Sequence, residues 1–303
     1  MSYTKEIKEE IVALNKEGMS GRQIASYLGL SKSGVNTFLS SYYQYKRKPR
    51  ILFLDVETAP SVVVAFDRYD VTITPSHVLN EGGWIISASW SWYGEDKVHG
   101  FYDRTDVMMQ RDFDVTQRIV EEIEKADLVV AHNGDRFDIP VIKTRALQNK
   151  IVIKKSIKTI DTLKIAKRLK FNSNKLDSLG NYLGVGRKIP TTGITLWIQC
   201  MHGEVKALDT MLKYNKQDVQ LLKDVFDEIR AYDSSAINFG MFFDDGQEHC
   251  PSCGSPHLTE TGNVVRTGTG KFTELSCDEC GRISRRKQML NSKTQRAKLL
   301  SKA

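Results

Sequence analysis

Apolar positions recur with a helical period in the first 45 residues of the chain. They fall every three or four positions, which predicts three short helices. The residues that carry this period are Ile7, Ile11, Leu14, Ile24, Ala25, Leu28, Val35, Phe38 and Leu39. Gly18 and Gly29 interrupt it, and Ser20 with Gln23 matches a capping box that begins the second helix. Residues 1–45 are therefore expected to form a small all-α domain.

Three short helices in this order resemble a helix-turn-helix, in which the third helix enters the DNA major groove. The outward-facing polar residues of that helix are Lys32, Ser33, Asn36 and Thr37, and we predict that they contact DNA. The alternative is a small helical bundle that packs on another domain or on a partner protein.

Strand-like patterns take over from about residue 50. They predict strands at residues 51–57, 84–93, 97–103 and 127–133 and helices at 115–126, 139–149, 161–170, 175–183 and 206–231. Strands followed by a helix and a buried strand indicate a mixed α/β sheet flanked by helices, over residues 50–232. Polar linkers without periodicity, near residues 42–49 and 233–248, are expected to bound this domain.

Positive charge is concentrated at two places in the chain. Residues 282–303 hold eight of the 44 Lys and Arg residues and no acidic residue, so the rest of the chain has 36 basic against 37 acidic side chains. The second cluster follows the tyrosines at positions 42, 43 and 45, which can stack on bases. Either cluster could be a solvated surface, but together they favour nucleic acid as partner. The predicted contacts are Lys46, Arg47, Lys48, Arg285, Arg286 and Lys287.

The composition is typical of a globular protein, with 40% hydrophobic and 27% charged residues. The apolar runs are too short to cross a bilayer, and the charged N-terminus lacks the apolar stretch of a secretory signal. We therefore expect a cytoplasmic protein without a membrane partner; its small modules would suit a phage protein acting in the host cytoplasm.

Three acidic motifs follow one another in the α/β region. Asp55 and Glu57 end the first predicted strand on one face, where a divalent cation would relieve their repulsion. Asp138 lies at a strand-to-helix junction, where it could instead be a helix cap. Tyr214 and Asp218 are four residues apart on a predicted helix and share one face. Each motif alone is common, but each lies on an element that lets its carboxylate reach a common point.

The order of these motifs resembles the DEDDy 3′-to-5′ exonucleases of the ribonuclease H-like superfamily, which include the proofreading domains of family B DNA polymerases and stand-alone relatives. The resemblance covers roughly residues 50–232 and implies a ribonuclease H-like mixed sheet. It also implies that two Mg²⁺ or Mn²⁺ ions are held by Asp55, Glu57, Asp138 and Asp218. Tyr214 corresponds to the tyrosine that orients the attacking water; the sister group has histidine there.

The resemblance predicts removal of nucleotides from single-stranded or 3′ ends, with DNA favoured over RNA. Asn133 and Phe137 are expected to shape the second motif and the pocket for the terminal nucleotide. One rival is a non-catalytic DNA-binding regulator, and another is an exoribonuclease of the same fold. Because the length leaves no room for a polymerase domain, any proofreading would act in trans, beside replication or repair proteins.

Four of the five cysteines form two C-x-x-C pairs, Cys250 with Cys253 and Cys277 with Cys280. Thiolates at this spacing fit one structural Zn²⁺ and predict a zinc ribbon over residues 247–285, followed by a basic tail at 286–303. Two disulfides are the alternative, which a cytoplasmic location disfavours. Cys200 is left over and is expected to be inert.

Overall fold

The computed structural model describes residues 3–46, 49–67, 69–103, 112–233, 237–243 and 245–300. The chain divides into two compact units. One is Pro49–Ala236, and the other comprises Met1–Lys48 and Ile237–Ala303.

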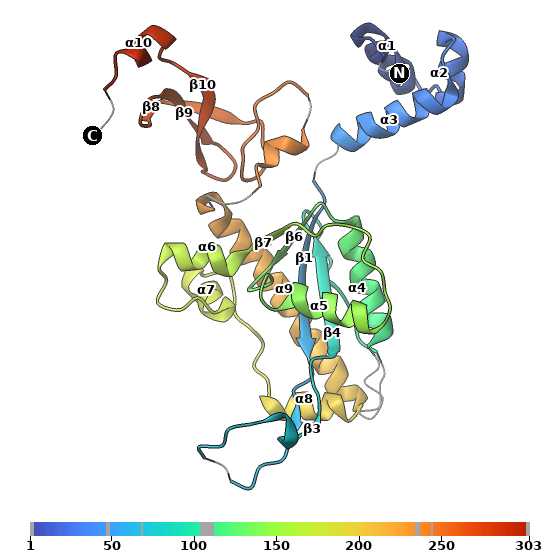
Figure 1. Ribbon diagram of the computed structural model, residues 1–303, viewed down its shortest axis with the longest axis vertical. Coiled ribbons are helices and arrows are strands. Elements are labelled where there is room, and N and C mark those ends of the chain that lie inside the picture. The colour runs from blue at the N-terminus through green and yellow to red at the C-terminus, as the bar shows by residue number, and fades with distance from the viewer. Residues whose placement is uncertain are drawn as a thin grey trace. The chain divides into compact units, whose positions relative to one another are not determined.

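The unit Pro49–Ala236 is built on a five-stranded sheet (Figure 1). In spatial order the strands are β5 (His99–Phe101), β4 (Ile85–Trp92), β1 (Ile51–Thr58), β6 (Leu128–Ala131) and β7 (Thr159–Asp161). The pairs β5·β4 and β4·β1 are antiparallel, while β1·β6 and β6·β7 are parallel. The predicted mixed α/β sheet is therefore confirmed.

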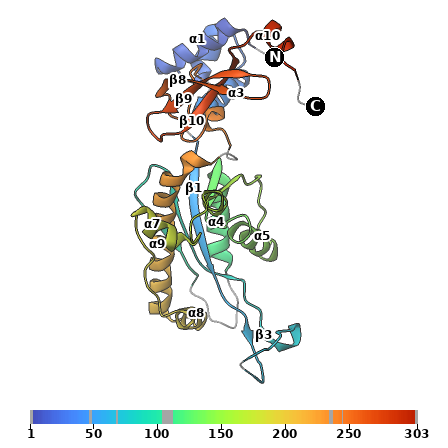
Figure 2. The same cartoon turned by 90° about the vertical axis from the view of Figure 1, so that its left-hand side faces the viewer.

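Helices cover both faces of this sheet. Figure 2 shows α9 on one side of β1 and α4 and α5 on the other. The helices of this unit are α4 (Phe113–Lys125), α5 (Asp138–Gln148), α6 (Thr162–Leu169), α7 (Leu176–Leu183), α8 (Ile194–Met201) and α9 (Val205–Ile229). Their positions agree with the predicted helices within about two residues, except α8, which the sequence did not reveal.

The two faces of β1 have different roles because its side chains alternate. Leu52, Leu54 and Val56 are almost fully buried in the core that includes residues of α4 and α5. Phe53 lies on the opposite face and packs edge-on against Phe226 of α9, with ring centroids 5.4 Å apart. The odd-numbered positions of β1 therefore face α9.

Between β1 and β4 the chain makes a small two-stranded hairpin, β2 (Val62–Val63) and β3 (Val78–Asn80), with a 3-10 turn at Pro75–His77. Several large apolar side chains of this segment are exposed, Phe66 and Tyr69 most of all. Such short strands carry too weak a pattern for sequence reasoning, which also missed β7.

The N-terminal residues form the three predicted helices, α1 (Lys5–Lys16), α2 (Gly21–Leu28) and α3 (Lys32–Lys46). Their common core contains Ile11, Ile24 and Val35. The Ser20–Gln23 capping box is confirmed. The predicted linker at 42–49 is wrong in part, because α3 continues to Lys46; no glycine or proline interrupts residues 35–48.

The C-terminal residues form a three-stranded antiparallel sheet in the order β10-β9-β8. Its elements are β8 (Leu258–Arg266), β9 (Lys271–Cys277) and β10 (Ile283–Met289), preceded by a 3-10 turn at Phe239–Phe242 and followed by α10 (Lys293–Ala297). β10 runs past residue 285, so the first residues of the predicted tail belong to the sheet. Among the described residues, no helix is both long and apolar enough to span a membrane.

Candidate active site

Asp55 and Glu57 project from the α9-facing side of β1, near the end of the strand. One ligand oxygen from each, together with one from Asp218 of α9, lie within 4.8 Å of one another. Strand alternation explains this meeting, because Asp55 and Glu57 share the face that Phe53 turns toward α9. The structure therefore brings together three of the four predicted acids as a group that could hold a metal ion.

Asp138, the fourth predicted acid, bonds to the same stretch of β1. It is the first residue of α5, is 1% exposed, and accepts a hydrogen bond from the backbone N–H of Val56 at 3.1 Å. Phe137, not Asp138, occupies the N-cap position and provides no capping side chain. The Asp138 carboxylate thus bonds to the strand between Asp55 and Glu57.

The acids strongly perturb one another. Burial, followed by the charges of Asp138, Glu57 and Asp218, raises the pKa of Asp55 well above its usual range. Burial is also the main cause that raises the pKa values of Glu57 and Asp138, each to about 7. A divalent cation would remove this cost, since nearby positive charge favours the ionised carboxylates.

Lys188 supplies positive charge to the cluster. Its Nζ donates to Asp218 Oδ2 at 2.5 Å and to the Tyr214 hydroxyl at 3.1 Å. Burial opposes the charged form, but Asp218 outweighs it and raises the pKa of Lys188. The backbone N–H of Lys188 donates to Asp177 Oδ1 at 2.8 Å, which fixes the loop that carries it. Sequence reasoning missed Lys188 because that loop has no periodicity or motif.

Tyr214 and Asp218 share one face of α9, as their spacing predicts. Burial raises the pKa of Tyr214 to about 12, and the Asp218 charge adds to the shift, so the phenol keeps its proton at neutral pH. Trp197 of α8 packs against the Tyr214 ring, with centroids 6.1 Å apart. Asp218 is 1% exposed, and its Oδ1 has no hydrogen-bond partner among the described residues.

Asn215 positions Asp55. Its Nδ2 donates to Asp55 Oδ2 at 2.6 Å, and its Oδ1 accepts from the Ser87 hydroxyl at 3.3 Å. Asn215 is fully buried, and its position beside Tyr214 was the only signal that sequence could have offered. The two contacts turn the amide so that its N–H faces the carboxylate.

A cleft of about 650 Å³ opens beside the acids. Asp55, Asn133 and Lys188 line it, together with the segment from Ser173 to Asp177. His132 connects this segment to α6. One of its ring nitrogens lies 2.9 Å from Thr162 Oγ1, and the other lies 2.9 Å from the Asn174 carbonyl oxygen. The cleft is large enough for a nucleotide-sized ligand.

Of the two predicted pocket residues, Asn133 and Phe137, only Asn133 lines this cleft. Asn133 has a positive φ of 68° and lines the cleft, while its backbone N–H donates to Asp161 at 2.9 Å. Asp161 also caps α6, because its side chain accepts a hydrogen bond from the Leu163 N–H. Phe137 is 40% exposed and therefore is not a core residue.

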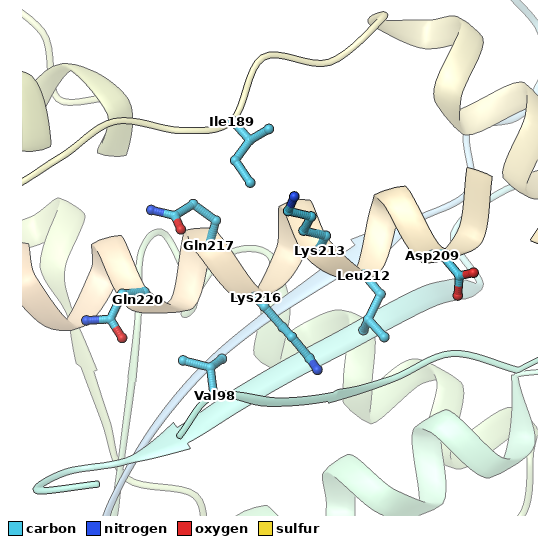
Figure 3. A pocket seen from close by; sticks show the side chains of 8 residues that line it. All are labelled: Val98, Ile189, Asp209, Leu212, Lys213, Lys216, Gln217 and Gln220. Carbon is cyan, nitrogen blue, oxygen red and sulfur yellow. The ribbon is translucent and has the colours of Figure 1, made fainter. Parts of the chain in front are cut away.

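A second hollow, of about 480 Å³, lies along another face of α9 (Figure 3). Lys213, Lys216 and Gln217 line it, with Val98 and Ile189 on either side. None of the predicted acids lines it, so the cleft beside Asp55 is the candidate active site.

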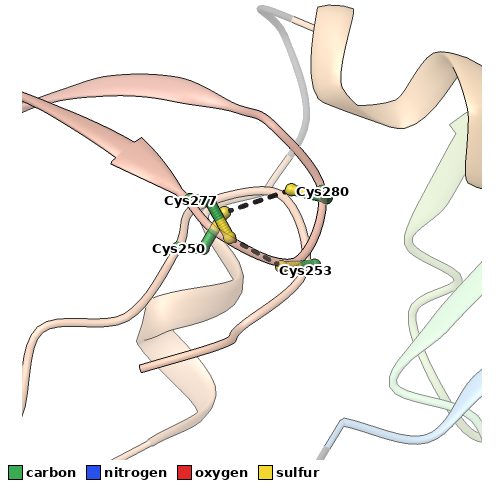
Figure 4. A group of neighbouring side chains, drawn as sticks. All are labelled: Cys250, Cys253, Cys277 and Cys280. Carbon is green, nitrogen blue, oxygen red and sulfur yellow. Dashed lines mark hydrogen bonds between the residues drawn. The ribbon is translucent and has the colours of Figure 1, made fainter. Parts of the chain in front are cut away.

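Four thiols cluster in the C-terminal sheet (Figure 4). Sγ of Cys250 lies 3.6 Å from Sγ of Cys280, and Sγ of Cys253 lies 3.6 Å from Sγ of Cys277. Sulfurs bound to one tetrahedral Zn²⁺ lie about 3.8 Å apart, given Zn–S bonds of about 2.3 Å. All four sulfurs lie within 4.8 Å of one another, so they could hold one metal ion, and no disulfide joins them.

The predicted nucleic-acid contacts have different surroundings. Lys32, Ser33, Asn36 and Thr37 are all exposed on α3. Lys46 ends α3, while Arg47 and Lys48 lie outside the described residues.

In the C-terminal sheet, two of the three predicted contacts, Arg285 and Arg286, already interact with other side chains. Arg285 lies 3.9 Å over the Phe272 ring, and Arg286 pairs with both Glu248 and Glu260. Lys287 is exposed. These local contacts could not be predicted from a run of basic residues.

Comparison with known proteins finds one family match inside the central unit. Residues 81–230 match the profile of the RNase_H superfamily. The mixed sheet flanked by helices is consistent with an RNase H-like fold. The matched range includes Asp138, Tyr214 and Asp218 but begins after Asp55 and Glu57. Hereafter the unit Pro49–Ala236 is called the RNase H-like domain.

The family B DNA polymerase from the hyperthermophilic archaeon Pyrobaculum calidifontis is a solved structure that the chain resembles. The TM-score is 0.46 and the identity 14%; the match covers 66% of this chain and 28% of the polymerase chain. No curated protein matches the sequence. The superfamily supports a nuclease that acts on nucleic acid.

Proposed function

We propose that the RNase H-like domain is a 3′-to-5′ exonuclease that hydrolyses phosphodiester bonds with two divalent metal ions. The observation that carries this proposal is the acidic cluster, whose oxygens from Asp55, Glu57 and Asp218 lie within 4.8 Å of one another. DNA is the favoured substrate. The order of the motifs, with Tyr214 in the last one, supports the DEDDy type.

The cluster fits Mg²⁺ or Mn²⁺. Its donors are carboxylate oxygens, which hard divalent cations prefer. Oδ1 of Asp218 is buried without a hydrogen-bond partner among the described residues, and such an atom is costly unless a ligand satisfies it. We assign Asp55, Glu57, Asp138 and Asp218 as the residues that would hold the metal ions.

When bound, the two ions would activate water and stabilise the charge that develops on the phosphate and on the departing 3′ oxygen. Tyr214 keeps its phenolic proton, so its hydroxyl can hold the attacking water in place by a hydrogen bond. Lys188 brings a positive charge to the same side of the cluster. Asn215 keeps Asp55 turned toward the cleft.

The nucleotide at the 3′ end would occupy the cleft of about 650 Å³ beside Asp55. Asn133 lines this cleft and Phe137 is exposed, so both remain candidates to contact the nucleotide. We also propose that α1–α3 form a DNA-binding helix-turn-helix, and that the four thiols bind one Zn²⁺ in a ribbon. Both modules would hold the nucleic acid that the domain trims.

Digestion of labelled oligonucleotides tests the reaction and its direction. Single-stranded DNA and RNA of one sequence, labelled at the 5′ end, are incubated with the protein and Mg²⁺. We expect a ladder of products that shorten one nucleotide at a time, with DNA degraded faster. Release of a labelled mononucleotide from the 5′ end of the same substrates would contradict the assigned direction.

A further inference from the structure

A separate pocket lies in the C-terminal sheet, at the tip of the hairpin that joins β8 to β9. Its volume is about 400 Å³, and its walls come from the turn at residues 267–270 and from the segment that carries Leu290 and Leu299. Arg266 and Lys271 stand at the two sides of the turn. The pocket involves none of the four thiols.

We propose that this pocket binds one nucleotide unit of a single-stranded nucleic acid, with the phosphate held by Arg266 and Lys271. The two residues are direct partners across the hairpin. Like charges at directly opposed positions repel and destabilise a hairpin. A phosphate between them would remove that repulsion, so the pair favours an anionic ligand.

None of the residues that line the pocket is acidic. Residues 264–273 and 287–300 hold six basic residues and no Asp or Glu. Among the described residues, neither Arg266 nor Lys271 forms an ion pair with a carboxylate. In contrast, Arg286 in the same sheet is paired with two. Arg266 Nη1 donates to the Val264 carbonyl at 3.2 Å, but neither charge is neutralised by a carboxylate, so both are available to phosphate, unlike that of Arg286.

The turn is held in one shape before any ligand binds. The backbone N–H groups of Thr267 and Gly270 donate to the Gly270 carbonyl and the Thr267 hydroxyl, at 2.9 and 3.1 Å. Asn291 accepts from the Lys271 N–H at 2.9 Å and donates to the Thr269 carbonyl at 2.8 Å. Because the walls are fixed, binding would cost little ordering of the protein.

The apolar wall indicates a nucleotide rather than a bare phosphate. Leu290 and Leu299 are 55% and 52% exposed, and they can cover the face of a base or a sugar. Bases in a duplex are stacked and hidden, whereas a single strand offers them to such a surface. The pocket therefore fits one unit of a single strand.

Binding of a fluorescent single-stranded oligonucleotide tests the pocket. Anisotropy is measured without added Mg²⁺ and without a chelator, over a range of salt concentrations. The test variant is Arg266→Gln with Lys271→Gln. The matched control is Lys97→Gln with Lys143→Gln, which removes the same charge from exposed positions of the RNase H-like domain.

We expect the test variant to flatten the salt dependence of log K by about 0.7 to 1.4, since each phosphate contact on a single strand contributes about 0.7. At 0.1 M salt this corresponds to a loss of affinity of roughly 5- to 25-fold. The control should change both quantities much less. Equal effects of the two variants, or no effect of either, would overturn the proposal.

Two further binding measurements identify the ligand. Leu299→Ser should weaken binding without changing the salt slope, because it alters only the apolar wall. Tight binding of free dAMP to the pocket, lost in the Arg266→Gln, Lys271→Gln variant, would make a free nucleotide the ligand and overturn the strand assignment.

The inference uses the proposed function only for the presence of a nucleic-acid substrate, and the two can fail separately. A protein that binds the oligonucleotide through this pocket but never cleaves it would refute the exonuclease. A protein that cleaves, and whose test variant binds like wild type, would refute the pocket.

Discussion

Replacing Glu57 by glutamine should stabilise the metal-free RNase H-like domain, and only at high pH. Burial raises the pKa of Glu57 from its ordinary value near 4.5 to about 7, and the Asp218 charge adds to the shift. The folded protein therefore holds a proton on Glu57 that the unfolded chain releases between these two pH values. Stability falls across this window by about 1.4 kcal/mol per pH unit.

The full cost is reached above pH 7 and amounts to about 3 kcal/mol, because one unit of pKa shift corresponds to about 1.4 kcal/mol. Glutamine has nearly the same shape and never ionises. The variant and the wild type should therefore be equally stable near pH 4.5, and the variant should be more stable at pH 8 by up to this amount. Neighbouring acids share the repulsion, so about 3 kcal/mol is an upper value.

Tryptophan fluorescence during urea unfolding can measure the difference in this domain alone. All four tryptophans, Trp84, Trp90, Trp92 and Trp197, lie within it. Glu228→Gln, at an exposed position of α9, is the matched control and should change stability by no more than about 0.5 kcal/mol at either pH.

With saturating Mg²⁺ at pH 8, the wild type should instead be more stable than the variant. The ion stabilises the intact carboxylate cluster and binds the variant less well. A Glu57→Gln variant that is no more stable than wild type at pH 8 without metal would refute the reasoning. A gain in stability of the same size at pH 4.5 and at pH 8 would also refute it.

Three further changes probe other parts of the account. Tyr214→Phe should slow cleavage by roughly 10²-fold without weakening substrate binding, since it removes only the hydroxyl that holds water; a raised Kd with unchanged turnover would contradict this. Lys188→Met should make unfolding more sensitive to Mg²⁺ than in wild type, because Asp218 loses the cation that it has without metal; an unchanged Mg²⁺ effect would argue against that. Cys250→Ser should lower the zinc content, by elemental analysis, from about one ion per chain; a wild type without zinc would exclude the ribbon.

The fold of the RNase H-like domain could be predicted because its large elements carry strong patterns. β1 and β4 are long and buried, and α9 repeats apolar positions over 25 residues. β7 and α8 were not predicted from the sequence, for opposite reasons. β7 has only three residues, and α8 is apolar nearly all round, so neither shows a period.

The meeting of Asp55, Glu57 and Asp218 could be predicted because each motif lies on one element and its side-chain direction follows from that element. Lys188 and Asn215 act across elements that are distant in sequence. Lys188 reaches Asp218 over 30 positions, and Asn215 reaches Asp55 over 160. No local pattern contains such contacts, which arise only when the sheet and α9 pack together. The same holds for Arg286, whose partners Glu248 and Glu260 lie in other parts of the ribbon.

The measurement that tests the central claim most directly is the Mg²⁺ dependence of 3′-end cleavage by wild type and by the Asp55→Ala, Glu57→Ala variant. The substrate is single-stranded DNA labelled at the 5′ end, and circular dichroism and zinc content establish that both proteins are folded. The account predicts a Mg²⁺-dependent ladder from the wild type and none from the variant. Equal cleavage by both proteins, or no cleavage by a folded, zinc-loaded wild type, would contradict it.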